Sequence, residues 1–193
     1  MTTMASPGGV DGESLLRGAL VRLTGPRSSD AGEMARWSDE SQYMRMVDSD
    51  WMRPRTSDDS PLGRAGSSPT GVEFRIRELA DDRLLGFLAV HSIEWNNQLG
   101  EISIGIGNPA DWGKGYGSEA MRLALRYAFH ELNLNRVWLT VISYNARAIH
   151  LYEKLGFRHE GVRRQAVLRD GKRYDMLVMG LLRSEWESSM RPT

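Results

Sequence analysis

Cysteine is absent from this 193-residue chain, which excludes a disulfide-stapled scaffold. Long hydrophobic runs are absent as well. The longest, 84–90 and 176–182, are each interrupted by a glycine and fall far short of the about 20 residues that cross a bilayer. Residues 1–14 carry acidic groups where a signal peptide has its apolar core. We therefore expect a cytoplasmic protein with no membrane span.

An excess of either charge is also missing, because 25 basic residues balance 25 acidic ones. Without a basic stripe, the composition argues against a nucleic-acid partner. The four histidines show no ligand spacing, so no metal site is expected. The length fits one domain, which we place at 15–190 after a flexible tail over 1–14, where small and polar residues predominate.

Hydrophobic periodicity alternates between the strand and helix types along the chain. Period-two or short apolar runs predict strands at 20–23, 72–77, 84–93, 101–106, 137–142, 161–168 and 174–181. Helical spacing predicts helices at 28–39, with Ser28 or Ser29 as its cap, and at 41–47, 118–132 and 146–155. Three prolines deny a regular element to 50–71, which is either a lid or disordered. This order predicts an α+β (mixed α/β) fold, with helices packed on a sheet.

A glycine-rich turn between the strand at 101–106 and the next helix is the richest chemical signal. Gly113, Gly115 and Gly117 permit positive φ and close approach of a ligand to the backbone. The helix that follows offers free N–H groups and a partial positive charge. The turn is therefore an anion site, and pyrophosphate is a natural occupant.

Two common phosphate motifs fit this turn poorly. The pair Gly113-Lys114 is followed by glycine and has no glycine five residues before it, so it is not a P-loop. The stretch Gly105-Ile-Gly-Asn-Pro-Ala110 matches a dinucleotide fingerprint in letters alone. Pro109 lacks the N–H donor that this fingerprint needs, and we expect no helix to begin there.

Two sequence motifs carry a family resemblance. Trp112-Gly-Lys-Gly-Tyr-Gly117, followed by Ser-Glu-Ala, resembles the coenzyme A loop of the GNAT acetyltransferase superfamily in its RimJ/RimL-like form. Asn145-Ala-Arg-Ala-Ile-His-Leu-Tyr152-Glu-Lys-Leu-Gly156-Phe157 resembles the second signature of that branch. The likeness covers about 72–186. Trp112 replaces the Gln or Arg of the wider superfamily, while the glycines are intact.

The resemblance implies a GNAT fold, in which a mostly antiparallel sheet splays into a V with helices on both faces. Acetyl-CoA would lie as cosubstrate between the strands that end near Ile106 and Ile142. One N–H of the first strand would hold the thioester oxygen as it becomes an oxyanion. The cofactor-binding residues expected on this basis are Ile104, Gly105, Ile106, Trp112, Gly113, Lys114, Gly115, Tyr116, Gly117, Ser118 and Asn145. Asn145 has a second reading, as a helix N-cap.

The resemblance also assigns the chemistry. Tyr152 is the expected general acid that protonates the coenzyme A thiolate. Glu101 is our choice to take the proton of the amine, directly or through water, and Ser143 is a weaker candidate to orient the amine. Trp37 and Trp51 lie where the family builds its acceptor pocket, although tryptophans are often simply core residues.

The predicted function is acetyl transfer to a primary amine, either a protein N-terminus or a small molecule. Because no cysteine can form a thioester intermediate, direct attack in a ternary complex is expected, and a serine ester route stays open. The alternatives are a non-catalytic acyl-CoA sensor or scaffold and a transferase of longer acyl groups. The branch also makes a homodimer possible.

Overall fold

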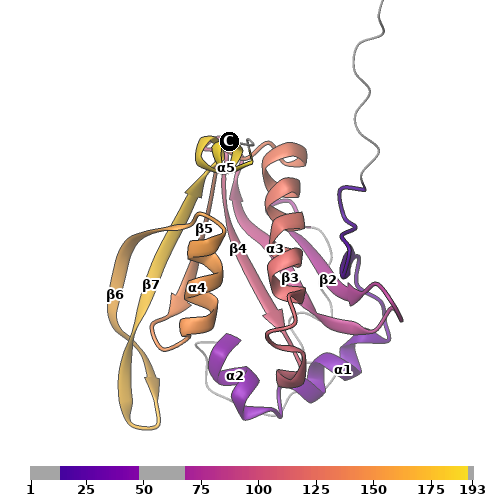
Figure 1. Cartoon of the computed structure of the whole chain (residues 1–193). Helices are drawn as coiled ribbons and strands as arrows, with labels where there is room; N and C mark the ends of the chain where they lie inside the picture. Colours follow the sequence, from indigo (N-terminus) through magenta and orange to yellow (C-terminus); the bar gives the residue numbers. More distant parts are fainter. Residues whose placement is uncertain (1–13, 48–67, 191–193) are drawn as a thin grey trace, which may run out of the picture.

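Seven strands form one sheet in the computed structural model, which describes residues 14–47 and 68–190 (Figure 1). The strand order is β1-β2-β3-β4-β5-β7-β6, and β4–β5 is the parallel pair among antiparallel neighbours. The strands are β1 (Val21–Thr24), β2 (Val72–Glu78), β3 (Leu84–Glu94), β4 (Leu99–Ile106), β5 (Arg136–Ile142), β6 (Arg158–Arg169) and β7 (Lys172–Leu182). All seven strands expected from the sequence are present, and β6 and β7 are longer than expected.

The four predicted helices are present, α2 with the predicted ends and the others with shifted ends, and two short elements are additional. The helical elements are α1 (Asp30–Trp37), α2 (Ser41–Val47), the 3₁₀ turn η1 (Pro109–Asp111), α3 (Tyr116–Arg126) with its π-helical extension η2 (Tyr127–Glu131), α4 (Ala146–Lys154) and α5 (Arg183–Ser189). The expectation that no helix begins at Pro109 is wrong, because the ring fits the first turn of η1, where no N–H is needed. Ser29 stands at the N-cap position of α1, as expected, but its side chain makes no capping hydrogen bond. The Asp30 carboxylate accepts the N–H of Arg27, just before the helix.

The sheet opens into a V between β4 and β5. These strands pair over three residues each, Leu99–Glu101 with Arg136–Trp138, and then separate. Figure 1 shows them side by side at the top of the molecule and apart at the bottom, with α3 in front of one arm and α4 in front of the other. The expected splayed, mostly antiparallel sheet is thereby confirmed.

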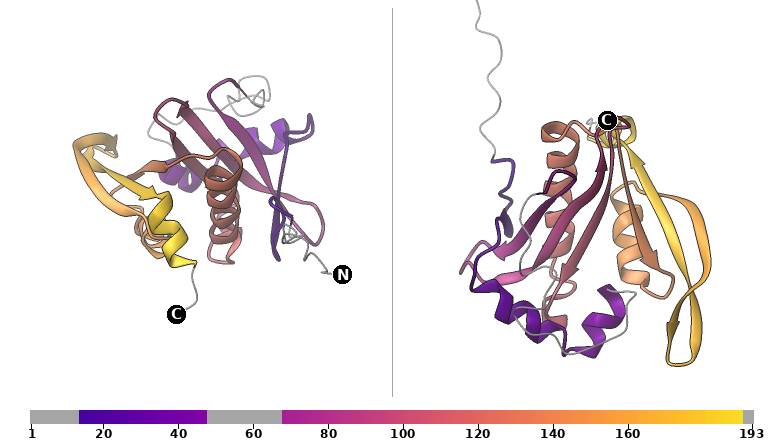
Figure 2. Two further views of the ribbon diagram at one scale, coloured as in Figure 1. Left: turned by 90° about the horizontal axis from the view of Figure 1, so that it is seen from above. Right: turned by 180° about the vertical axis from the view of Figure 1, so that it is seen from behind.

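Two apolar cores lie on opposite faces of the β1–β4 arm. Leu88 and Ile102 belong to the main core, which α3 covers. Phe87, the neighbour of Leu88 in β3, belongs to a smaller core with α1 and α2. Successive residues of a strand point to opposite faces, so the two cores confirm helices on both sides of the sheet (Figure 2).

Polar residues of β2 are buried as well as apolar ones. Arg75 is fully buried, with Nη1 2.7 Å from Glu73. Arg77 reaches Asp30 of α1 at 2.5 Å. Burial raises the pKa of the Glu73 carboxyl, and Arg75 opposes this shift. Buried charges persist when they are paired, and these pairs link β2 to α1.

The segment before β1 is fastened to α3 by one carboxylate. Glu119, in the first turn of α3, accepts the N–H groups of Ala19, Leu20 and Val21 at 2.9, 2.7 and 2.7 Å. A Cβ at Gly18 would lie 2.4 Å from the Cδ of Glu119, so this approach requires glycine. The glutamate of the first motif thus holds the N-terminal strand against the glycine turn.

None of the helices formed by the described residues has both the length and the apolar character that crossing a membrane requires.

Candidate functional site

The glycine turn leads into α3 as the sequence predicted. Gly113 and Gly115 have φ of 79° and 91°, in the region that favours glycine, and Gly115 occupies the N-cap position. The first N–H of α3 that bonds within the helix is that of Glu119, to the carbonyl of Gly115. The N–H groups of Tyr116, Gly117 and Ser118 precede it at the positive end of the helix. The turn therefore presents several donors to an anion.

A network of charged residues supports the turn from behind. Asp111, which is 5% exposed, receives Arg83 at 2.6 Å and Lys114 at 3.1 Å. These cations lower the pKa of the Asp111 carboxyl, the Arg83 hydrogen bond having the larger effect. Glu78 accepts a second Arg83 hydrogen bond at 2.8 Å and that of the Tyr116 hydroxyl. Both ends of the turn are thereby tied to β2 and the β2–β3 turn.

The β4 backbone has one edge turned toward the opening of the V. Gly107 donates its N–H to Leu85 of β3, and alternation then directs the N–H and C=O groups of Ile104 and Ile106 away from β3. The Ile106 carbonyl is consistent with this, because it accepts the indole N–H of Trp112 at 2.8 Å. Gly105 is required on the other face, where a Cβ would lie 2.6 Å from the ring of Phe87.

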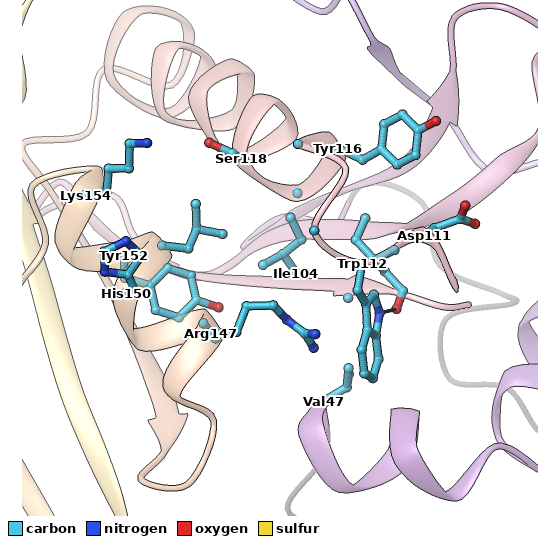
Figure 3. Close-up of a pocket in the computed structure, with 17 residues that line it drawn as sticks. Val47, Ile104, Asp111, Trp112, Tyr116, Ser118, Arg147, His150, Tyr152 and Lys154 are labelled. Carbon is cyan, nitrogen blue, oxygen red and sulfur yellow. Dashed lines mark hydrogen bonds between the residues drawn. The ribbon is translucent and has the colours of Figure 1, made fainter. Parts of the chain in front are cut away.

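A cavity of about 310 Å³ lies between the two arms of the V, and we call it the cofactor groove (Figure 3). Its lining residues are Val47, Ile104, Gly105, Ile106, Asp111, Trp112, Gly113, Gly115, Tyr116, Gly117, Ser118, Arg147, Ala148, His150, Leu151, Tyr152 and Lys154. Nine of the eleven cofactor-binding residues expected from the sequence are among them. The other two, Lys114 and Asn145, lie outside this lining.

Three basic side chains of α4 face this groove and were missed in the sequence. Arg147, His150 and Lys154 recur at helical spacing along one side of α4. In Figure 3 Arg147 extends across the groove to Trp112, and its guanidinium carbon lies 4.0 Å from the indole centroid. Desolvation lowers the pKa of Arg147. The signal was available, because positions 147, 150 and 154 share a face of the predicted helix.

Tyr152 lies on α4 at the inner end of the groove. Its side chain is 7% exposed, and burial raises the pKa of its phenol to about 12. The phenol is therefore protonated throughout the neutral range. Its ring packs against Phe157, 5.8 Å between centroids.

A second cavity, of about 150 Å³, opens beside the groove, and we call it the acceptor-side cavity. Its lining residues are Met46, Val47, Glu101, Ile102, Ser103, Ile104, Thr140, Val141, Ile142, Tyr152 and Met176. Tyr152, Ile104 and Val47 line both cavities. The structure therefore brings Glu101 and Tyr152 into one cavity that adjoins the groove.

Three expected site residues have other partners. Lys114 pairs with Asp111. Asn145 caps α4 through the N–H of Ala148 at 3.2 Å and donates to the Met46 carbonyl at 3.1 Å, so both of its polar atoms are engaged. Ser143 lies outside the lining of both cavities, and its N–H donates to Asp175 at 2.9 Å.

Of the two tryptophans considered for the acceptor pocket, the structure describes one. Trp37 is 5% exposed in the smaller core, and a Cβ at Gly107 would lie 2.0 Å from its ring. This arrangement favours the core reading for Trp37. Trp51 and most of the 50–71 loop lie outside the described residues.

Comparison with known proteins agrees with this geometry. The family model described as "Acetyltransferase (GNAT) domain" matches residues 21–158. The "Putative ribosomal N-acetyltransferase YdaF" of Bacillus subtilis (strain 168) is 34% identical over 117 residues, 61% of this chain and 62% of that protein. A spermidine N(1)-acetyltransferase of Vibrio cholerae is 33% identical over 109 residues, 56% of this chain and 62% of its own length. The matches thus span less than two thirds of these relatives.

Solved structures confirm the fold. A crystal structure of spermidine N-acetyltransferase from Vibrio cholerae in complex with CoA and spermine superposes with a TM-score of 0.77. The alignment covers 86% of this chain and 98% of that one at 24% identity. Since the family model covers most of the chain and the V-shaped sheet is shared, this protein belongs to the GNAT acetyltransferase family.

Proposed function

We propose that this protein transfers an acetyl group from acetyl-CoA to a primary amine by direct attack in a ternary complex. One observation carries the proposal: Tyr152 and Ile104 line both the cofactor groove and the acceptor-side cavity. A thioester carbonyl and an attacking amine must meet within about 3.5 Å for reaction. Two cavities that share lining residues offer a place where these two reactants can meet.

The residues of the groove fit a long, anionic, amide-bearing cosubstrate. The N–H groups at the start of α3 suit the pyrophosphate, and the cations of α4 add favourable charge. The outward edge of β4 offers backbone groups at Ile104 and Ile106 to the amides of pantetheine. Acetyl-CoA supplies an activated acetyl group when bound, and the chain has only to orient it and manage protons.

Tyr152 is the proposed general acid for the departing thiolate. Its raised pKa keeps the phenol protonated before the step, as a general acid must be. Glu101, in the acceptor-side cavity, is the proposed acceptor of the amine proton, directly or through water. Ser143, in the β5–α4 turn, stays a weaker candidate because it is not among the residues that line either cavity.

The acceptor is either a small amine or a protein N-terminus. The name of one relative specifies spermidine, and that of another specifies a ribosomal substrate. The two classes differ in how much base they need. At pH 7 an amine of pKa about 10.4 is neutral about once in 2,500 molecules, whereas an α-amine near 7.8 is neutral more than a tenth of the time.

The test measures acetyl-CoA binding by calorimetry and coenzyme A release with spermidine and with short peptides bearing free N-termini. Wild type is expected to bind acetyl-CoA and to turn over at least one of these amines. Tyr152→Phe is expected to bind acetyl-CoA normally and to lose about 10²-fold in kcat, the usual worth of a general acid.

Tyr127→Phe is the matched control. Tyr127 is a half-buried phenol that packs edge-on against Phe74, 5.1 Å between centroids, and lies outside both cavity linings. Its substitution should leave kcat unchanged. Binding without turnover of any amine would favour the alternative function of an acyl-CoA sensor, and absence of acetyl-CoA binding would refute the proposal.

A further inference from the structure

A histidine, a serine and a glutamate meet beside the acceptor-side cavity. His91 of β3 lies opposite Glu101 of β4 in the strand register. The Nε2 atom of His91 is 3.1 Å from the Ser103 hydroxyl, and its Nδ1 atom is 3.9 Å from Oε2 of Glu101. No local sequence pattern predicts this group, because nine residues and a hairpin turn lie between His91 and Glu101.

The backbone around His91 is irregular. Ser92 has φ of 52°, a conformation that costs a non-glycine residue about 1 kcal/mol or more. The β3–β4 register also shifts between His91 and Glu94. The Ser92 hydroxyl lies 3.1 Å from Nδ1 of His91, so this bulge gives the imidazole a second polar partner.

The three side chains connect the cavity with solvent. Ser103 and Glu101 both line the acceptor-side cavity, whereas His91 does not. The His91 side chain is 40% exposed. A proton that reaches Ser103 therefore has an imidazole within hydrogen-bond distance, and that imidazole has access to water.

We propose that Ser103 and His91 form the relay that removes the proton of the acceptor amine, an inference that rests on the proposed function. The amine N–H proton passes to Oγ of Ser103 while the Ser103 hydroxyl proton passes to Nε2 of His91. The electron pair left on nitrogen forms the bond to the acetyl carbon. The imidazolium then releases a proton from Nδ1 to solvent.

This relay refines the role of Glu101. An imidazole is a stronger base than a carboxylate. The carboxylate of Glu101 lies 3.9 Å from Nδ1 of His91. Glu101 therefore supplies the negative charge that stabilises the imidazolium, and His91 holds the proton.

The experiment measures kcat against pH from about 5, where histidine titration begins, to about 9, one unit above its usual range. Each assay uses acetyl-CoA and the better of two probe amines, spermidine and an alanine-initiated tetrapeptide. Wild type is expected to show an acid limb, because the imidazole must be neutral to accept a proton. His91→Gln and Ser103→Ala are each expected to lose about 10²-fold in kcat at the wild-type plateau. In His91→Gln the acid limb should vanish as well.

His159→Gln is the matched control, since His159 is exposed, lies on β6 and pairs with Glu153 at 3.0 Å. His159→Gln should retain the wild-type kcat and the acid limb of its pH profile. The acetyl-CoA dissociation constant, measured by calorimetry, should match wild type in all three variants and exclude misfolding. His91→Gln and Ser103→Ala act on one relay, so the double variant should be no slower than either alone.

Three outcomes would overturn the relay. An unchanged acid limb in His91→Gln would contradict the relay. A loss of kcat in His91→Gln without a loss of kcat in Ser103→Ala would contradict it as well. Mass spectrometry that finds an acetyl group on Ser103 after incubation with acetyl-CoA alone would make the serine a nucleophile instead. If wild type turns over an amine and Tyr152→Phe does not, the proposed function stands whatever the His91 variants do. If wild type turns over no amine, both proposals fall.

Discussion

Removing the Glu119 carboxylate should destabilise the protein by breaking the clamp on the segment before β1. The carboxylate accepts three backbone N–H groups at 2.7–2.9 Å. Hydrogen bonds to a charged group contribute about 1.5–3 kcal/mol where water cannot replace them. Water can reach the N–H groups of Ala19 and Leu20, which are exposed, but not readily that of Val21, which is fully buried. We therefore expect Glu119→Ala to lower the free energy of unfolding by about 2–3 kcal/mol.

The assay is urea unfolding at 25 °C, followed by tryptophan fluorescence. With an m-value of about 2 kcal/mol/M, the midpoint should fall by about 1–1.5 M urea. Glu131→Ala is the control, because Glu131 is an exposed glutamate at the other end of the same helical segment. Its midpoint should stay within about 0.25 M of wild type, the usual range for such a substitution.

A double-mutant cycle with Gly18 isolates the contact. A Cβ at Gly18 would displace the Glu119 carboxylate, so Gly18→Ala alone should also cost about 2 kcal/mol. In the Glu119→Ala background the obstacle is gone, and the same change should cost less than about 0.5 kcal/mol. Two results would refute this reasoning. The free-energy changes of Gly18→Ala and Glu119→Ala could be additive, or the urea midpoint of Glu119→Ala could equal that of wild type; in either case the Glu119 hydrogen bonds do not stabilise this segment.

Three further outcomes are expected. Asp30→Asn should lower the free energy of unfolding by about 3 kcal/mol in urea melts, because it leaves the charge of Arg77, 4% exposed, without its partner at 2.5 Å. Gly115→Ala should lower both stability, by about 1 kcal/mol, and acetyl-CoA affinity in calorimetry, since φ there is 91°. Asp82 has a pKa lowered to about 2 by hydrogen bonds from Arg22 and then a second arginine. A carboxyl whose pKa is lower in the folded than in the unfolded protein stabilises the fold above the unfolded pKa of about 3.9, and this stabilisation is lost as the pH falls toward 2. The difference in free energy of unfolding between wild type and Asp82→Asn should therefore be constant above about pH 4 and shrink below it.

The fold was largely predictable because its strands and helices carry clear periodicity and its two motifs are specific. The exception is the second face of β2. Its polar residues are buried because Asp30, more than forty residues earlier in the chain, brings a helix against them. Pairing over that separation leaves no local pattern. The capping bond of Ser29 is absent for a different reason, since its backbone is in the right-handed helical region and not in the extended conformation that is typical of a capping residue.

The part of the site that the glycine turn and the β4 backbone form was predictable from the sequence. The side-chain contacts that depend on strand register were less predictable. The glycine turn and the β4 edge depend on local sequence, so their residues line the groove as expected. The α4 cations share a helical face that the sequence already contained. The contact of His91 with Ser103 could not be predicted, because it depends on the hairpin register and on a bulge. Asn145 caps its helix, and contact with a cofactor stays a prediction.

Because β4 pairs with β5 over only three residues each, both strands have an unpaired edge in the middle of the sheet. Unpaired margins ordinarily invite other chains to add on and aggregate, and proteins protect them at the periphery. Here they lie beside the cofactor groove, between α3 and α4, and not at the periphery of the sheet. Backbone amides on the unpaired edge of β4 should therefore exchange with deuterated water as readily as those of an edge strand. A slender extended ligand that fills the space between β4 and β5 should slow this exchange.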